Sequence, residues 1–248
     1  MFLAADIGNS RINFSLTDDK SIVKSMILDT DINKDSDFYM DKLTSAFSSY
    51  DITDCAIISV VKNVDKIIKK ACDKAFGVNS VILEAKNTSE IKINSDAPQT
   101  VGMDRLANVY GVMDMLLPAI VVDIGTAVTF DILSKDKIFL GGVIMPGINM
   151  QLKALSNGTS KLPEIELEKS PYAIGNDTKT CILSGVIRGT AAAIDGLLGQ
   201  CIEELGGCKT IVLTGGQAEL ISKYMKHPFN HIDKNLTLSG IKRMYALY

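Results

Sequence analysis

Residues 3–14 read LAADIGNSRINF, and residues 120–131 read IVVDIGTAVTFD. In each stretch an apolar run leads to Asp-Ile-Gly, and a small polar residue and an alternating run follow. The two aspartates, Asp6 and Asp123, stand 117 positions apart in a chain of 248 residues, close to half its length. A pattern that repeats at this spacing predicts two similar halves, each of which begins with the same hairpin.

Each hairpin has the composition of a phosphate-binding turn. The apolar run before Asp is typical of a buried central strand, and we expect Gly8 and Gly125 to take positive φ in a tight turn. Backbone N–H groups in such a turn can surround a phosphate oxygen, and the Asp carboxylate can hold Mg²⁺ directly or through water. One copy alone would favour an ordinary hairpin, whereas the duplicate favours the phosphate-binding function.

Strands and helices alternate through the rest of the chain, which indicates an α/β fold. Buried strands are expected at 55–61 and 210–213, and further strands at 80–84 and 137–143. Helices are expected at 65–76, 105–117, 149–155, 176–205 and 218–223. The helix at 105–117 should stop at Pro118, and the long helix at 176–205 should kink near Gly185, Gly189 or Gly196. The predicted domains are residues 1–117 and 118–248.

Composition is that of an ordinary globular protein, with 46% hydrophobic and 22% charged residues and a net charge of −3. Lysines are interspersed with acids, which argues against a nucleic-acid partner. The five cysteines form an odd set without Cys-x-x-Cys spacing, which favours a reducing compartment. Apolar runs are too short to span a bilayer, and the start lacks a signal-peptide pattern. We therefore expect a cytoplasmic protein that does not enter a membrane.

Further motifs complete a set that resembles the type III pantothenate kinases, within the superfamily of actin, sugar kinases and heat-shock chaperones. In chain order after the first hairpin they occupy 101–108 (with Gly-x-Asp-Arg), 122–129, 141–147, 162–163, 175–178, 184–185, 213–216 and 238–241. Each motif alone is weak, but their joint order is specific, and the Gly-x-Asp-Arg element separates this family from sugar kinases. One departure is Ser95, where the family often has Tyr.

The resemblance implies two ribonuclease-H-like domains, which are duplicated units of the βββαβα type and bind ATP in a cleft between them. It also implies a homodimer. It implies that the γ-phosphoryl group of ATP is transferred to pantothenate, which gives 4′-phosphopantothenate in the first step of coenzyme A synthesis. The implied cofactors are Mg²⁺, bound as Mg-ATP, and a monovalent cation, K⁺ or NH₄⁺.

The resemblance also assigns roles to residues by motif. The implied ATP contacts are Asp6, Ile7, Gly8, Asn9, Ser10, Arg11, Ile12, Asn13, Thr126, Gly215 and Gly216. The implied pantothenate contacts are Gly102, Met103, Asp104, Arg105 and, from the partner subunit, Thr178. Asp6 would hold Mg²⁺ through ATP, and Asp123 would bind the monovalent cation.

Asp104 is the candidate general base. A carboxylate near the attacking hydroxyl can orient it and accept its proton late in phosphoryl transfer. Arg105 offers a planar fork suited to a carboxylate or a phosphoryl oxygen. The simpler interpretation of Asp104 is an acid at a helix start, stabilised by the helix dipole. Thr178 could likewise be only a residue near a helix N-cap.

Two rival functions stay open at this stage. The first is a kinase of another small hydroxylated substrate on the same fold. The second is a non-catalytic nucleotide-binding regulator of gene expression, which would need degraded catalytic positions or a nucleic-acid surface. Asp6, Asp104 and Asp123 are all present, which favours the enzyme.

Overall fold

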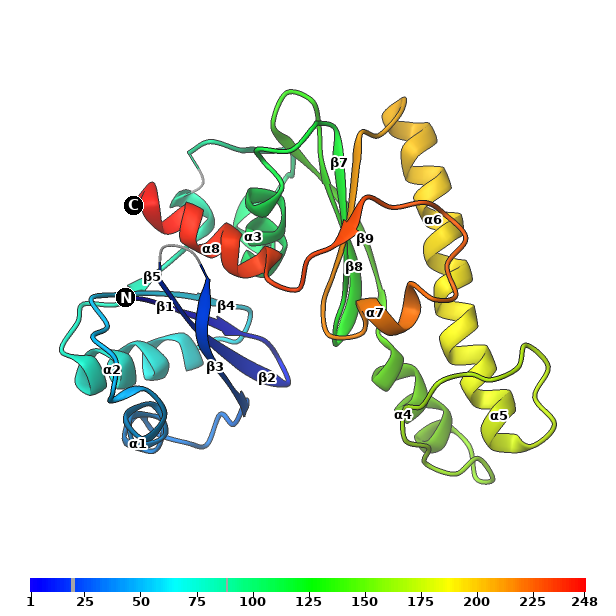
Figure 1. The fold of residues 1–248 in the computed structure, drawn as a ribbon, viewed down its shortest axis with the longest axis horizontal. Coiled ribbons are helices and arrows are strands. Elements are labelled where there is room, and N and C mark those ends of the chain that lie inside the picture. The colour runs from blue at the N-terminus through cyan, green and yellow to red at the C-terminus, as the bar shows by residue number, and fades with distance from the viewer. Residues whose placement is uncertain (19–20, 88) are drawn as a thin grey trace. The chain divides into compact units, whose positions relative to one another are not determined.

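The computed structural model describes residues 1–18, 21–87 and 89–248, and the chain divides into two compact units (Figure 1). Unit 1 comprises Met1–Gly111 and Leu236–Tyr248, and unit 2 comprises Val112–Asn235. This division differs from the predicted boundary after residue 117 chiefly in the last helix, which packs in unit 1.

The sheet of unit 1 has the strand order β3-β2-β1-β4-β5. The strands are β1 (Phe2–Ile7), β2 (Arg11–Thr17), β3 (Ile22–Asp29), β4 (Asp54–Ser59) and β5 (Val81–Ile82). Strand β1 pairs antiparallel with β2 and parallel with β4, so it lies inside the sheet. Its apolar residues are buried, as expected for a central strand.

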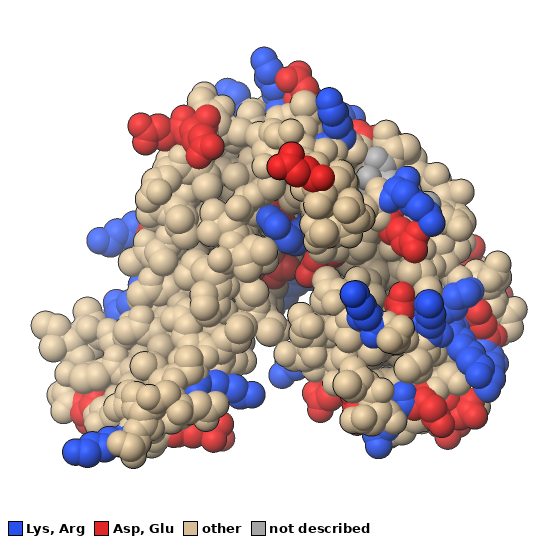
Figure 2. Space-filling view, turned by 180° about the vertical axis from the view of Figure 1, so that it is seen from behind, with Lys and Arg blue, Asp and Glu red and all other residues tan. Residues whose placement is uncertain are grey.

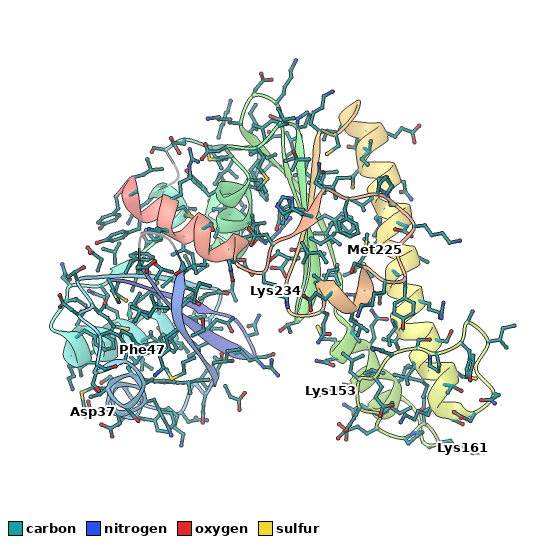
Figure 3. The ribbon with its side chains drawn as sticks, in the orientation of Figure 1. Asp37, Phe47, Lys153, Lys161, Met225 and Lys234 are labelled. Carbon is teal, nitrogen blue, oxygen red and sulfur yellow. The ribbon has the colours of Figure 1, made fainter. Side chains whose placement is uncertain are left out.

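Helices α1 (Ser36–Phe47) and α2 (Val64–Phe76) pack side by side against the core of unit 1 (Figure 1). The Asp35 carboxylate caps α1 by accepting the N–H of Phe38 at 2.9 Å. Phe47, labelled in Figure 3, ends the helix and is fully buried. Apolar residues from one face of the sheet and from both helices thus form one core.

Helices α3 (Met103–Gly111) and α8 (Leu236–Ala246) also belong to unit 1. They pack so closely that a Cβ on Gly240 would collide with the carbonyl of Ala107. Asn108 is buried, and its Oδ1 accepts a hydrogen bond from Thr237 Oγ1 at 2.8 Å. The C-terminal helix therefore supports the helix that carries Asp104.

Unit 2 repeats the strand arrangement of unit 1. Its strands are β7 (Ala119–Ile124), β8 (Ala127–Leu133), β9 (Ile138–Pro146), β10 (Thr210–Thr214) and β11 (His231–Ile232). Strand β7 pairs antiparallel with β8 and parallel with β10, β8 pairs antiparallel with β9, and β10 pairs parallel with β11. Among the strands that belong to unit 2, the order β9-β8-β7-β10-β11 matches the order β3-β2-β1-β4-β5 of unit 1, which confirms the duplication predicted from the two hairpins.

The helices of unit 2 are α4 (Ile148–Gly158), α5 (Thr178–Leu183), α6 (Gly189–Leu205) and α7 (Ala218–Ile221). A π-helical turn, Ser184–Arg188, joins α5 to α6 in the region where the sequence predicted a kink. The continuous helix Thr178–Leu205 is long and apolar enough to cross a membrane by length and composition alone. Half of its apolar window is buried inside the structure, and one such helix is weak evidence for a membrane span.

The bounds of one expected helix were wrong, and some elements were not predicted. The helix expected at 105–117 begins at Met103 and ends at Gly111, because glycine is costly inside a helix and Pro118 disfavours helical backbone before it. No residue range was predicted for the helices α1 and α8 or for the short strand β11. Short elements at Ala85–Asn87, Lys92–Ile93 and Pro98–Thr100 connect β5 to α3.

Candidate active site

The first loop joins β1 to β2 through Gly8, Asn9 and Ser10. The N–H of Gly8 donates to the Arg11 carbonyl at 2.9 Å and closes the turn. The expected positive φ was wrong for Gly8 and also for Gly125 in the second loop. Gly8 is favoured for its size instead, because a Cβ there would lie 3.2 Å from the Arg11 carbonyl oxygen.

This first loop presents polar groups beside a carboxylate. Asn9 and Ser10 are exposed, and within the described residues their backbone N–H groups have no hydrogen-bond acceptor. Asn13 lies opposite Asp6 in the β1–β2 pairing, and its side chain hydrogen-bonds the Asp6 carboxylate. Unpaired N–H groups near an acid at a strand end suit a phosphate with its bound cation.

The carboxylates of Asp6 and Asp104 lie close enough in unit 1 for the charge of Asp104 to affect the pKa of Asp6. Burial raises the pKa of Asp6 to about 7, with the negative charge of Asp104 as the second cause, while the Asn13 hydrogen bond acts in the opposite direction. Burial also raises the pKa of Asp104, opposed by the backbone N–H and the charge of Arg105. A buried carboxylate whose ionisation a neighbouring carboxylate disfavours is relieved by a cation or a proton, and such groups gather at functional sites.

The residues before and after Asp104 fix its carboxylate in place. Oδ1 of Asp104 accepts the N–H of Arg105 at 2.9 Å in the first turn of α3. A Cβ on Gly102 would collide with the same oxygen, so glycine leaves room for the carboxylate. Met103 is buried, which anchors the helix start in unit 1. The residues of the Gly-x-Asp-Arg segment therefore together hold the Asp104 carboxylate in place.

The second loop joins β7 to β8 through Gly125 and Thr126. The N–H of Gly147 donates to the Thr126 carbonyl at 3.2 Å, and a Cβ on Gly147 would collide with the backbone of both loop residues. Gly215, at φ +89°, approaches the end of β7 so closely that a Cβ would collide with Asp123 Oδ1. The turns after β9 and β10 therefore both lie against this loop.

A row of polar residues crosses the ends of β10, β7 and β8. Thr214 pairs with Asp123, which pairs with Thr129 on its other side. Side chains alternate along a strand, so this row lies on the face opposite the apolar residues that pack in the core with α6. Thr129 Oγ1 donates to the carboxylate of the fully buried Asp131 at 3.3 Å. Thr129 and Thr214 lie in motifs found in the sequence, but no role was assigned to either, because only the strand register brings them beside Asp123.

Two other predicted contacts lie on the surface of unit 2. Thr178 is exposed and is the first residue of α5. Asp177 caps that helix by accepting the N–H of Thr180 at 2.7 Å, so Thr178 does lie near a helix N-cap. Gly216 is exposed, and a Cβ there would meet open space. The ligand contacts assigned to Thr178 and Gly216 stay predictions.

The donor groups suit a metal ion that arrives together with phosphate. Among the residues that the structure describes, no group of three or more His, Cys, Asp or Glu side chains could hold an ion. Asp6 supplies carboxylate oxygen, which Mg²⁺ prefers, and Mg²⁺ commonly takes its other ligands from substrate phosphates and water. Mg²⁺ carried by ATP therefore fits the Asp6 carboxylate.

The duplicated strand order and the two Asp-Ile-Gly loops define a member of the ATPase fold class that includes actin and the sugar kinases. A Listeria monocytogenes protein described as an N-acetylmannosamine kinase shares this fold, with a TM-score of 0.56 and 12% identity over 99% of this chain and 98% of that one. The model of the type III pantothenate kinase family matches residues 2–200. The chain belongs to this family and is a kinase.

The sequence relatives of this chain match it along both units. The type III pantothenate kinase of Finegoldia magna is 37% identical over 98% of this chain and 95% of its own. That of Persephonella marina is 34% identical over 100% of this chain and 99% of its own. A Campylobacter jejuni structure described as a conserved Baf family transcriptional activator is 26% identical, with a TM-score of 0.64, over 98% of this chain and 97% of that one.

Proposed function

We propose that this kinase transfers the γ-phosphoryl group of ATP to the hydroxyl of pantothenate and forms 4′-phosphopantothenate, the first step of coenzyme A synthesis. The observation that supports this most directly is the pair of carboxylates in unit 1. Asp6 lies beside a loop with unpaired N–H groups, and Asp104 lies on the helix of the Gly-x-Asp-Arg motif. A phosphate site and a proton acceptor are thereby close together.

Asp104 acts as the general base. Phosphoryl transfer depends mainly on positioning and charge neutralisation, with a late proton transfer from the attacking hydroxyl. As the new O–P bond forms and the bond to ADP breaks, the hydroxyl proton passes to the Asp104 carboxylate. The raised pKa of Asp104 gives this carboxylate a higher proton affinity than an exposed aspartate has. Arg105 suits the pantothenate carboxylate or a phosphoryl oxygen.

The loops bind the nucleotide. In unit 1, the N–H groups of Asn9 and Ser10 contact phosphate oxygens, and Asp6 holds the Mg²⁺ of Mg-ATP. Bound Mg²⁺ supplies neutralisation of the phosphate charge. In unit 2, Thr126 contacts ATP, and the glycine turn after β10 admits the adenine. Substitutions in either loop should therefore weaken the binding of ATP.

Asp123 binds a monovalent cation, K⁺ or NH₄⁺. Its carboxylate lies within a polar row with Thr129 and Thr214, which offers oxygen ligands near the second loop. Activity should therefore be higher in K⁺ than in Na⁺. An Asp123→Asn variant should lose this preference.

A homodimer completes the proposal, with Thr178 contributing to the partner's pantothenate site. Apolar side chains of unit 2 are strongly exposed, among them Ile174 at 88%, Ile144 at 64% and Tyr172 at 60%. Apolar surface of this kind is typical of contact with a partner. Light scattering should give twice the mass of one chain. Because ATP is an intracellular substrate, we expect a cytoplasmic protein.

The decisive experiment measures ADP release with ATP, Mg²⁺ and pantothenate. Asp104→Asn should abolish turnover and leave ATP binding largely intact. Asp65→Asn is the matched control, because Asp65 also lies in a first helical turn and accepts the N–H of the next residue, at 2.8 Å. If Asp104 only stabilised its helix, both variants would keep activity. A panel of sugars and polyols in place of pantothenate tests the alternative substrate class.

A non-catalytic regulator of gene expression is the second candidate, favoured by the description of the Campylobacter jejuni structure. Positive and negative side chains are mixed across the face shown in Figure 2, unlike the basic stripe of a DNA-binding surface. A gel-shift experiment with promoter DNA separates the two functions. Specific DNA binding without ATP turnover would favour the regulator.

A further inference from the structure

The residue that follows β3 holds the first loop by two hydrogen bonds. Thr30 Oγ1 donates to the Gly8 carbonyl at 2.7 Å, and the N–H of Thr30 donates to the Ser10 carbonyl at 3.1 Å. The two acceptors flank Asn9, which is the exposed tip of the loop. Thr30 therefore fixes the backbone on both sides of Asn9.

These hydrogen bonds determine which backbone groups of the first loop remain available to a ligand. The Ile7 carbonyl accepts from Val60 at 3.0 Å, and the N–H of Gly8 is used within the turn. With the carbonyls of Gly8 and Ser10 held by Thr30, the N–H groups of Asn9 and Ser10 are those without an acceptor in the described part of the chain. A loop held in one conformation binds phosphate without an ordering cost.

Thr30 is itself anchored in the core of unit 1. Tyr39 of α1 is fully buried, and its hydroxyl donates to the carbonyl of the next residue, Asp31, at 3.0 Å. The N–H of Asp31 bonds the same hydroxyl at 3.3 Å, and the Asp31 carboxylate accepts from Asn33 at 2.9 Å. The position of Thr30 is therefore set by the core of unit 1 and not by the first loop.

The internal repeat supplies an independent comparison. Gly147 follows β9 as Thr30 follows β3, and its N–H donates to the carbonyl of Thr126, the residue before β8, as Thr30 does to Ser10 before β2. The backbone bond is thus common to both units. The hydroxyl bond occurs only in unit 1, where the loop is one residue longer. In unit 2 a side chain at 147 would collide with the loop.

We propose that Thr30 is a positioning residue for ATP, and that its hydroxyl bond to the Gly8 carbonyl holds the longer loop in the conformation that receives the phosphates. This inference rests on the proposed function of the loop. Loss of the hydroxyl frees one end of the loop while the backbone bond to Ser10 remains. Binding of phosphate groups should weaken, whereas binding of an uncharged nucleoside should not change.

The test compares three variants by calorimetry with Mg²⁺-AMPPNP and with adenosine. Thr30→Val removes the hydroxyl, and Thr30→Ser keeps it. Thr17→Val is the matched control, because Thr17 Oγ1 donates to the Phe2 carbonyl at 3.4 Å at the other end of the same hairpin. One hydrogen bond corresponds to a rise in the AMPPNP Kd of about five- to tenfold for Thr30→Val.

The inference predicts that rise for Thr30→Val alone, with adenosine affinity and urea midpoint like those of the Thr17→Val control. Wild-type AMPPNP affinity in Thr30→Val would overturn it, and so would equal losses for AMPPNP and adenosine, or an equal loss in Thr30→Ser. Wild-type turnover with pantothenate is measured in parallel. Its absence would count against the proposed function, whereas the AMPPNP comparison tests Thr30 either way.

Discussion

Asp6→Asn should make the ligand-free protein more stable above neutral pH, although it should abolish catalysis. Burial and the charge of Asp104 raise the pKa of Asp6 from 3.8 to about 7. Such a shift makes the ionised form about 4 kcal/mol less favourable in the folded than in the unfolded state at alkaline pH. Asn has the same shape without the charge and can still pair with Asn13.

The pH dependence follows from the direction of this shift. Because the pKa of Asp6 is higher in the folded state, its carboxyl group contributes fully to the free energy of unfolding below pH 3.8. That contribution is lost as the pH rises towards 7. Asp6→Asn has no carboxyl group at this position, so its free energy of unfolding does not fall with pH for this reason. Its stability advantage over wild type should therefore grow by roughly 3 kcal/mol between pH 5 and pH 8.

Hydrogen exchange of peptides from β1 and β2, recorded with EDTA present, measures this advantage for unit 1 itself. Asp37→Asn is the control with the opposite sign, because the Lys74 ion pair lowers the pKa of Asp37 at the exposed start of α1. That variant should gain no stability at pH 8. A constant difference between Asp6→Asn and wild type from pH 5 to pH 8, or a less stable variant at pH 8, would refute the reasoning.

Glycine substitutions provide the other tests. Gly102→Ala should displace the Asp104 carboxylate and lower kcat by about 10- to 100-fold with little change in thermal stability, as steady-state kinetics can check. Gly215→Ala combines positive φ with a collision against Asp123, so it should cost about 2 kcal/mol or more in urea denaturation and reduce activation by K⁺. Gly240→Ala should separate α8 from α3 and lower the stability of unit 1 by about 3 kcal/mol or more, measured by hydrogen exchange.

The sequence predicted the features that are repeated. Two Asp-Ile-Gly hairpins separated by half the chain predict a duplicated α/β fold, and the order of the five strands within each unit agrees. The candidate residues on those hairpins lie at the ends of β1 and β7, because a strand followed by a glycine turn is a local pattern. Asp104 was found through its motif and not through periodicity.

Long-range packing could not be predicted from local patterns. The contact of Thr30 with the first loop depends on β3, which has no clear alternation of apolar residues. The docking of α8 depends on Asn108 and Thr237, which are 129 positions apart. The contact of Gly147 with Thr126 exists only when β8 and β9 are paired, so no local pattern indicates it.

The central claim is that the Asp104 carboxylate serves phosphoryl transfer to pantothenate. Mass spectrometry of a reaction with ATP, Mg²⁺, K⁺ and pantothenate tests it most directly. The wild-type protein should convert pantothenate to a product heavier by one phosphoryl group, in step with ADP formation, and Asp104→Asn should form none. Unmodified pantothenate with the wild-type protein, or equal product from both proteins, would contradict the account.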